Sequence, residues 1–304
     1  MRAKLTSAAV LAATLALLGG AAEARAALPG QNGLIAIDDD RDGDHDIYVV
    51  RPSGRLVAKL TRNRANDFSP VWSPSGRRIA FVSDRDGDEE IYVMRADCTN
   101  VRQVTRNTGI ADNAPAWSPD GTRIVFTSAR SGGLDLYIAR PDGTPVRRLT
   151  RNPAIDATPS WSPDGRWIAF ASHRLGEGNA ELFKIRPNRT GLTRLTFNEG
   201  GFDVTNDDAE PSWSPDGKRI YYINNHAGTT DVYVLDADGG DITQLTDTPL
   251  FDESFPRLSP NGRRLLYASL SFDVPWTIRI ADADGTEPAA LRRGFFADWQ
   301  RVIG

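Results

Sequence analysis

The 304-residue sequence contains a single cysteine, Cys98, and only three histidines. One cysteine excludes an intrachain disulfide, so stability must come from packing and from how the chain closes on itself. The histidines, His45, His173 and His226, fall in separate segments, which disfavours a shared histidine-ligated transition-metal site. The sequence also lacks a G-x-S-x-G nucleophile elbow, so it carries no signature of a serine hydrolase.

Long hydrophobic runs are absent as well, and no segment is apolar enough to serve as a transmembrane anchor. The apolar run Ala8–Leu18 is too short to span a bilayer. It follows two basic residues and precedes the small-residue cleavage motifs Ala22–Ala24 and Ala24–Ala26. We therefore expect residues 1–26 to be a signal peptide and the protein to be exported, to the periplasm or out of the cell.

Positive charge is not in excess, since the formal net charge is −4 at pH 7. A mildly acidic chain lacks the overall basic character of a nucleic-acid-binding protein. We therefore expect no nucleic-acid partner.

What the sequence does have is one motif in many copies. The stretch P-x-W-S-P-D-G recurs. We call the tryptophan position, two residues after the first proline, the anchor, and successive anchors are 41 to 52 residues apart. The anchors are Trp72, Trp117, Trp161, Trp213, Leu258 and Trp299. A period of this length built from short strand patterns is typical of a β-propeller.

Each copy predicts four strands. The first precedes the S-P-D-G turn, the second is an apolar run such as Ile79–Ser83, the third alternates as in Ile91–Val93, and the fourth ends in a recurring L-T or V-T pair. Residues 33–61 lack a first strand and residues 297–302 supply one, so we expect the C-terminal strand to complete the first blade. The prediction is an all-β, six-bladed propeller over residues 27–304, with blades 33–61 plus 297–302, 70–105, 115–150, 159–196, 211–246 and 256–291.

The elements W-S-P-D-G, I-A-F-x-S, D-R-D-G, I-Y-V and L-T together resemble the propeller repeats of the TolB family. The resemblance extends over almost all of the expected mature chain. It implies a periplasmic protein that binds other proteins. Only the propeller part is matched, and the α/β domain that precedes it in the family has no counterpart in the expected domain organisation.

Acidic residues recur three positions before the proline of each motif, and we treat them as a candidate binding ring at the mouth of the central funnel: Asp67, Asp112, Asp156, Asp208 and Glu253. Such a ring attracts a cation or a basic partner segment. The alternative is a structural role, in which each carboxylate caps a turn. The arginine after the second strand also recurs, as in Arg85, and we expect it to pair with nearby carboxylates.

A further candidate is a calcium site in the first blade, where the motif D-x-D-x-D-G is followed by another aspartate. Alternating carboxylates around a glycine suit a hard cation that prefers oxygen ligands. The candidate ligands are Asp38, Asp40, Asp42, Asp44 and Asp46. The alternative is a polar hairpin turn without a metal, because Asp and Gly also favour turn geometry.

The repeat is broken most clearly in the fourth copy, which is longer than the others. Long loops on a rigid scaffold often carry binding residues, and here the candidates are Phe197, Phe202, Asp203 and Asp207. The alternative is a tolerated surface insertion. We also expect Arg257 and Asp298 to pair across the seam where the ring closes.

No nucleophile, base and orienting group come together in the sequence. The leading interpretation is an exported, non-catalytic, monomeric propeller that binds a protein or a cell-envelope polymer, with Ca²⁺ as a candidate ion and no other cofactor. The alternative is a propeller lyase or hydrolase with its site in the central funnel, because propeller enzymes draw catalytic residues from several blades.

Overall fold

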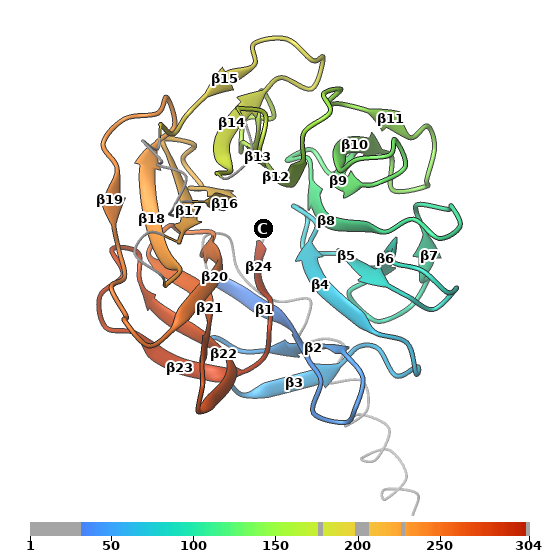
Figure 1. Ribbon diagram of the computed structural model, residues 1–304. Helices are drawn as coiled ribbons and strands as arrows, with labels where there is room; N and C mark the ends of the chain where they lie inside the picture. The colour runs from blue at the N-terminus through green and yellow to red at the C-terminus, as the bar shows by residue number, and fades with distance from the viewer. Residues whose placement is uncertain (1–31, 176–178, 198–206, 226–228, 302–304) are drawn as a thin grey trace, which may run out of the picture.

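The structure is a computed structural model that describes residues 32–175, 179–197, 207–225 and 229–301. Within these ranges there is no helix, and the strands form six antiparallel sheets of four strands each. The sheets stand around a common centre as the blades of a propeller (Figure 1). The expected signal peptide lies outside the described residues, and no described helix has the length and apolar character to span a membrane.

The predicted closure of the ring is confirmed in blade 1, which consists of β24 (Ala297–Arg301), β1 (Asn32–Asp39), β2 (Asp46–Val50) and β3 (Leu56–Lys59). The last strand pairs antiparallel with the first, and Trp299 lies opposite Ile35. Red β24 therefore runs beside blue β1 at the centre of Figure 1. This pairing removes two open sheet edges at once.

The other five blades each consist of consecutive strands. Blade 2 contains β4 (Asp67–Trp72), β5 (Arg78–Ser83), β6 (Glu90–Arg95) and β7 (Arg102–Gln103). Blade 3 contains β8 (Asp112–Trp117), β9 (Ile124–Ser128), β10 (Asp135–Ala139) and β11 (Arg147–Arg148). Blade 4 contains β12 (Asp156–Trp161), β13 (Ile168–Ser172), β14 (Glu181–Ile185) and β15 (Thr193–Arg194). Blade 5 contains β16 (Asp208–Trp213), β17 (Arg219–Asn224), β18 (Asp231–Asp236) and β19 (Thr243–Gln244). Blade 6 contains β20 (Asp252–Leu258), β21 (Arg264–Ser271), β22 (Val274–Asp282) and β23 (Ala289–Arg293).

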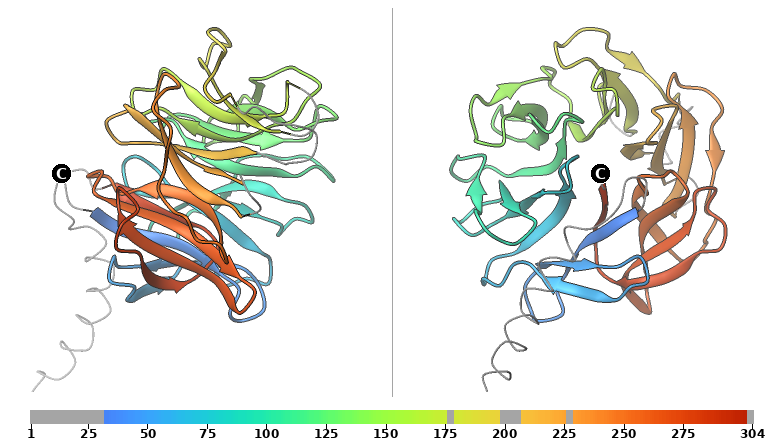
Figure 2. Two further views of the ribbon diagram at one scale, coloured as in Figure 1. Left: turned by 60° about the vertical axis from the view of Figure 1, so that its left-hand side comes forward. Right: turned by 180° about the vertical axis from the view of Figure 1, so that it is seen from behind.

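The hydrophobic core lies between the blades. The second strand of every blade is almost completely buried, which is why it reads as a continuous apolar run. One core cluster joins Val82 of blade 2 to Trp117 and Phe126 of blade 3, and the indole N–H of Trp117 donates to the carbonyl of Val71 at 3.2 Å. The anchor tryptophan thus packs against the preceding blade. The side view in Figure 2 shows the sheets stacked around the ring.

The first strand of each blade begins earlier than predicted. The sequence prediction placed the acidic residues in the loop before that strand, but Asp67, Asp112, Asp156 and Asp208 each start it, and Glu253 is its second residue. A β-bulge just before the motif proline carries the strand across the intervening residues. The residue at this bulge has a φ between +49° and +57° in five blades: Ser69, Ala114, Thr158, Glu210 and Phe255.

The bulges turn backbone N–H groups toward the preceding blade. Ser69 N–H donates to the Asp38 carboxylate at 3.0 Å, Thr158 N–H to the Thr127 hydroxyl at 3.3 Å, and Phe255 N–H to the Glu210 carboxylate at 2.5 Å. Non-glycine residues in the left-handed region carry a backbone cost. These inter-blade hydrogen bonds offset part of that cost.

We predict that Ala114→Gly leaves the stability unchanged or raises it by up to about 1 kcal/mol, because glycine removes the left-handed strain of a residue at φ +50°. The matched control is Ala116→Gly in the same strand, where φ is not positive. That change is expected to cost about 1 kcal/mol. Denaturant unfolding measures both, and equal destabilisation of the two variants would contradict the prediction.

Candidate functional site

The recurring acidic residues are buried, and none of them is more than 1% exposed. Arg85 donates to Asp67 at 2.8 Å, and Arg174 donates to Asp156 at 2.9 Å. Arg130 forms the same ion pair with Asp112. The arginine in each pair follows the second strand of the blade, so it ties that strand to the first. The structure therefore gives these three carboxylates a place inside the blade.

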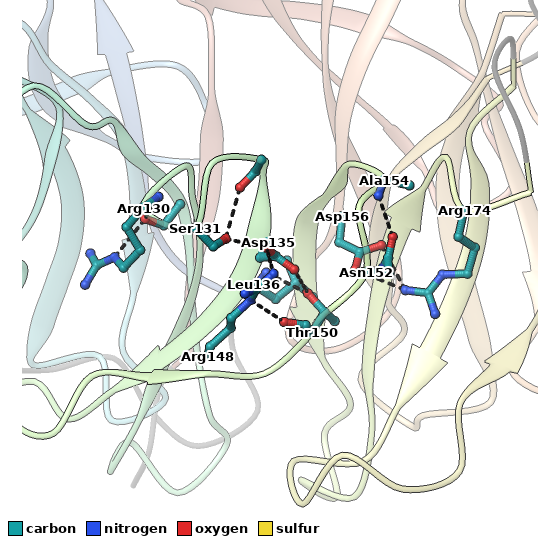
Figure 3. Close-up of polar contacts among 12 residues, drawn as sticks. Arg130, Ser131, Asp135, Leu136, Arg148, Thr150, Asn152, Ala154, Asp156 and Arg174 are labelled. Carbon is teal, nitrogen blue, oxygen red and sulfur yellow. Dashed lines mark hydrogen bonds and ion pairs between the residues drawn. The ribbon is translucent and has the colours of Figure 1, made fainter.

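Each of these carboxylates also receives a hydrogen bond from the connection that leads into its blade. Asn152 lies just after β11, and its side-chain amide donates to Asp156 at 2.7 Å. In the same way, Asn63 donates to Asp67 at 2.5 Å. Figure 3 shows this group, with Asn152 and Arg174 both directed at Asp156. One buried carboxylate thus joins two strands of its own blade to the connection that enters the blade.

A second acidic residue recurs at the start of the third strand, where the sequence reasoning did not identify it. The threonine of the L-T pair clips it in place: Thr61 donates to Asp46 at 2.9 Å, and Thr196 donates to Glu181 at 2.6 Å. In three blades a cation joins the clip, through the ion pairs Lys59–Asp46, Arg148–Asp135 and Arg194–Glu181. In blades 2 and 5 the equivalent residues are Gln103 and Gln244.

We call the contacts of blade 2 with blade 3 and of blade 5 with blade 6, where Gln103 and Gln244 replace the cation, the glutamine junctions. In each of them a buried glutamate has a raised pKa. Burial, with a contribution from the neighbouring Asp231 of blade 5, raises the pKa of Glu253 in blade 6 to about 7. Burial likewise raises the pKa of Glu90 in blade 2 to about 7, with Asp112 of blade 3 adding to the effect. Where the sequence supplies no cation between the paired carboxylates, folding therefore favours a proton.

The candidate calcium ligands of blade 1 separate into two groups. Asp42, Asp44 and Asp46 each place an oxygen atom within 4.8 Å of the others. Asp40 instead pairs with Arg293, at 2.6 Å. Asp38 is fully buried and accepts hydrogen bonds from three backbone N–H groups, those of Ser69, Phe295 and Phe296.

Lys59 occupies the acidic group of blade 1, because its ammonium group contacts both Asp42 and Asp46. These contacts raise the pKa of Lys59, so it stays charged. An ammonium group in this position competes directly with a metal ion. A second group of the same kind, Asp86, Asp88 and Glu90, lies in blade 2.

The clearest departure from the repeat lies around blade 6, where aromatic side chains gather at the seam with blade 1. Trp276 and Phe295 are 4.6 Å apart between ring centroids, and Phe255 lies 6.0 Å from Phe295 and 5.1 Å from Phe296. His45 of blade 1 lies 6.3 Å from Phe295. Its Nδ1 atom is buried and has no hydrogen-bond partner among the described residues.

Exposed apolar side chains extend this aromatic cluster outward. Leu250 is 75% exposed and Phe272 is fully exposed, while Val274 and Phe295 are 40% and 36% exposed. Leu250, Phe272 and Phe295 belong to connections between the second and third strands or between successive blades, and Val274 begins β22 directly after such a connection. In an antiparallel propeller blade these connections share one face. We call Leu250, Phe272, Val274, Trp276 and Phe295 the mouth patch.

Charged side chains lie on the first strands beside the aromatic cluster. Burial raises the pKa of Glu210 to about 7 and that of Asp298 to about 6, and the Arg257 guanidinium opposes both shifts. The predicted Arg257–Asp298 ion pair is not formed. Asp298 instead accepts a hydrogen bond from Trp72 N–H at 2.7 Å, and the Arg257 guanidinium lies over the Phe296 ring, 5.3 Å from its centre.

The candidate loop of blade 4 is described only in part. Phe197 is 65% exposed, with the guanidinium of Arg194 over its ring at 4.5 Å. Asp207 accepts a hydrogen bond from Ala180 N–H at 2.6 Å. Phe202 and Asp203 lie outside the described residues.

Comparison with known proteins places this closed, six-bladed propeller in a family. The family model for the TolB beta propeller domain matches residues 12–113 and 99–294. A TolB homologue of Chlorobium luteolum is 49% identical over 51 residues, which cover 17% of this chain and 12% of that protein. An uncharacterised protein of Agrobacterium fabrum is 33% identical over 82 residues, which cover 27% of this chain and 26% of that protein.

Solved structures agree with this result. TolB from Acinetobacter baumannii superposes with a TM-score of 0.74 at 25% identity, covering 88% of this chain and 66% of that one. An oligogalacturonate lyase from Vibrio parahaemolyticus superposes with a TM-score of 0.59 at 13% identity, over 86% of this chain and 74% of that one, a likeness of fold alone. The chain belongs to the TolB β-propeller family, and these two curated relatives match it over 12% and 26% of their own length.

The glutamine junctions make stability depend on pH. A carboxyl group whose pKa is raised from 4.5 to about 7 by folding binds a proton in the folded state, so stability falls as pH rises between these two values. We predict that Glu253→Gln, which removes the ionisation, raises the melting temperature relative to wild type at pH 8 more than at pH 5. Thermal unfolding at the two pH values measures this, and a pH-independent difference would contradict it.

The position of Lys59 leads to a prediction about calcium. In wild type the ammonium group already neutralises Asp42 and Asp46, so we expect Asp42→Asn to leave any response to Ca²⁺ unchanged. Lys59→Gln should lower the melting temperature in EDTA, and millimolar Ca²⁺ should restore it, because the carboxylates then lack a cation. The double variant Lys59→Gln/Asp42→Asn should lose this rescue. A Lys59→Gln protein that is insensitive to Ca²⁺ would refute the assignment.

Proposed function

We propose that this protein is an exported, non-catalytic propeller that binds a protein partner through the mouth patch. Membership of the TolB propeller family supports a binding role. The predicted signal peptide at residues 1–26 supports export. The mouth patch is the observation that carries the proposal, since exposed apolar residues grouped on one face of a protein are typical of interaction sites.

The mouth patch lies where the repeat is broken. The weak sixth copy has Leu258 in place of the anchor tryptophan and carries Phe272 in its turn and Trp276 in its third strand. A residue present in every blade serves the blade, as the buried Asp67 and its counterparts do. A residue present in one blade is free to serve a partner. Trp276 and Phe295 also offer the rigid aromatic surface on which binding hot spots are built.

A funnel enzyme is the alternative function. It is favoured by one observation, the raised pKa values of Glu210 and Asp298 near Arg257. The metal-ligating groups among the described residues contain carboxylates and no histidine. Both funnel carboxylates already hold backbone N–H groups in place, Glu210 that of Phe255 and Asp298 that of Trp72. These bonds favour a structural role.

The test is affinity capture from an envelope extract of the source cells, quantified by mass spectrometry. We expect the wild-type protein to retain a defined partner, and Leu250→Ser/Phe272→Ser to reduce its recovery about tenfold or more, because two highly exposed apolar contacts are lost. Both side chains are exposed, so the variant should fold.

The matched control is Val101→Ser/Leu192→Ser, which alters two exposed apolar residues on connections of the other face, 41% and 46% exposed. This control should retain the partner. Equal recovery by the mouth variant and wild type would refute the mouth patch as the binding surface. Turnover of an oligosaccharide or peptide that is lost in Glu210→Gln would support the enzyme instead.

A further inference from the structure

An arginine-rich cleft lies between blades 3 and 4, on the face opposite the mouth patch. Its volume is about 580 Å³, which falls within the range of small-ligand sites. The lining residues are Arg123, Arg147, Arg166, Arg186, Pro187 and Asn188. Connections between the first and second strands, and between the third and fourth, form this face. None of the recurring acidic residues lines the cleft.

Four different connections bring the arginines together. Arg123 and Arg166 follow the S-P-D-G turns of blades 3 and 4, and Arg147 begins the fourth strand of blade 3. Arg186 follows the third strand of blade 4. The sequence positions span 64 residues, so only the packing of neighbouring blades makes a cluster of them.

The cleft holds several of these side chains in defined positions. The guanidinium of Arg123 lies 5.3 Å from the ring centre of Trp161, and that of Arg186 lies 4.7 Å from the ring centre of Trp167. Arg147 donates to the carbonyl of Pro187 at 2.6 Å. Stacking on an indole orients a guanidinium while leaving its N–H groups free to donate.

Carboxylates do not neutralise the cluster. Within the described residues, Arg123, Arg147 and Arg186 have no carboxylate oxygen within 4.0 Å, and Arg166 has a single weak contact with Asp164 at 3.7 Å. The side chains of Arg166 and Asp164 are 80% and 52% exposed, so water screens their interaction. Asp164 beside Arg166 and the nearby Asp120, whose pKa Arg123 helps to lower, therefore compensate the four positive charges only in part.

The surroundings add to the positive charge. Desolvation, followed by the nearby charges of Arg151 and Arg147, lowers the pKa of the Arg189 guanidinium. Blades 3 and 4, residues 115–196, contain twelve lysines and arginines against seven aspartates and glutamates, whereas the whole chain has a net charge of −4. The positive field is thus concentrated at one side of an acidic protein.

We propose that this cleft binds a ligand bearing two or more phosphate groups. Guanidinium groups form paired hydrogen bonds with phosphate oxygens, and a ligand with several negative charges matches a cluster of four arginines better than a single carboxylate does. A small ligand with adjacent phosphates fits the volume of the cleft. The cleft and the mouth patch lie on different faces, so this proposal stands independently of the partner proposed above.

The test is isothermal titration calorimetry of the mature protein with sodium tripolyphosphate at low ionic strength. We expect saturable binding at one site. Arg147→Gln and Arg186→Gln should each weaken it about tenfold, and the double variant about a hundredfold, because each removes one charge-assisted contact. All three variants alter exposed side chains, so circular dichroism should match that of wild type.

Two matched controls use the same positions in blades that do not line the cleft. Arg102 is the counterpart of Arg147 in blade 2, and Arg263 is the counterpart of Arg166 in blade 6. Arg102→Gln and Arg263→Gln should bind tripolyphosphate like wild type. If they weaken binding as much as Arg147→Gln does, the interaction is with general surface charge and the site is refuted.

A carboxylate polymer distinguishes the class of ligand. We expect an oligogalacturonate of similar charge to bind at least tenfold more weakly than tripolyphosphate. Equal or tighter binding of the oligogalacturonate, with the same loss in Arg147→Gln, would overturn the phosphate assignment. Absence of binding to either probe at millimolar concentration would overturn the proposal as a whole.

Discussion

The buried carboxylate near the start of the first strand in five of the six blades is the interaction on which the propeller depends. Asp156 shows why: it accepts hydrogen bonds from Arg174, which follows the second strand of its blade, and from Asn152 in the connection that enters the blade. Burying a charge is costly unless it is paired and fully hydrogen-bonded, so each of these carboxylates fixes the geometry of its partners. Orientation between neighbouring blades follows from this local requirement, repeated around the ring.

The remaining features follow from how each junction meets that requirement. Lysine or arginine completes three junctions, and a proton favoured by folding completes the two that carry Gln103 and Gln244. Blade 6 departs furthest, and it adds the rings of Phe255, Phe295 and Phe296 to the polar contacts at the seam. The same scaffold therefore presents an apolar face at one side and an arginine cleft at the other.

The sequence was sufficient for the fold because the anchor Trp72 and its counterparts recur with a nearly constant interval, and each copy repeats the same strand pattern. The burial of Asp67 could not be predicted, because an acidic residue three positions before a proline is typical of a loop. In the structure the bulge at Ser69 lets the strand begin before the proline, at Asp67. Lys59 was missed because its contact with Asp42 depends on strand register across 17 residues. The aromatic cluster had a visible signal, since its phenylalanines fall in the copy that departs from the motif.

The pairing of β1 with β24 has a consequence for how the molecule forms. Ile35 and Trp299 are neighbours in space but 264 residues apart in the chain, so blade 1 is assembled only after the other five have been made. Until then β1 presents an unpaired edge, and contacts this distant in sequence form slowly. A chain that emerges gradually during synthesis would spend that interval with this edge open, and chaperones that cover strand edges would matter more to it than to a protein whose ends fold locally.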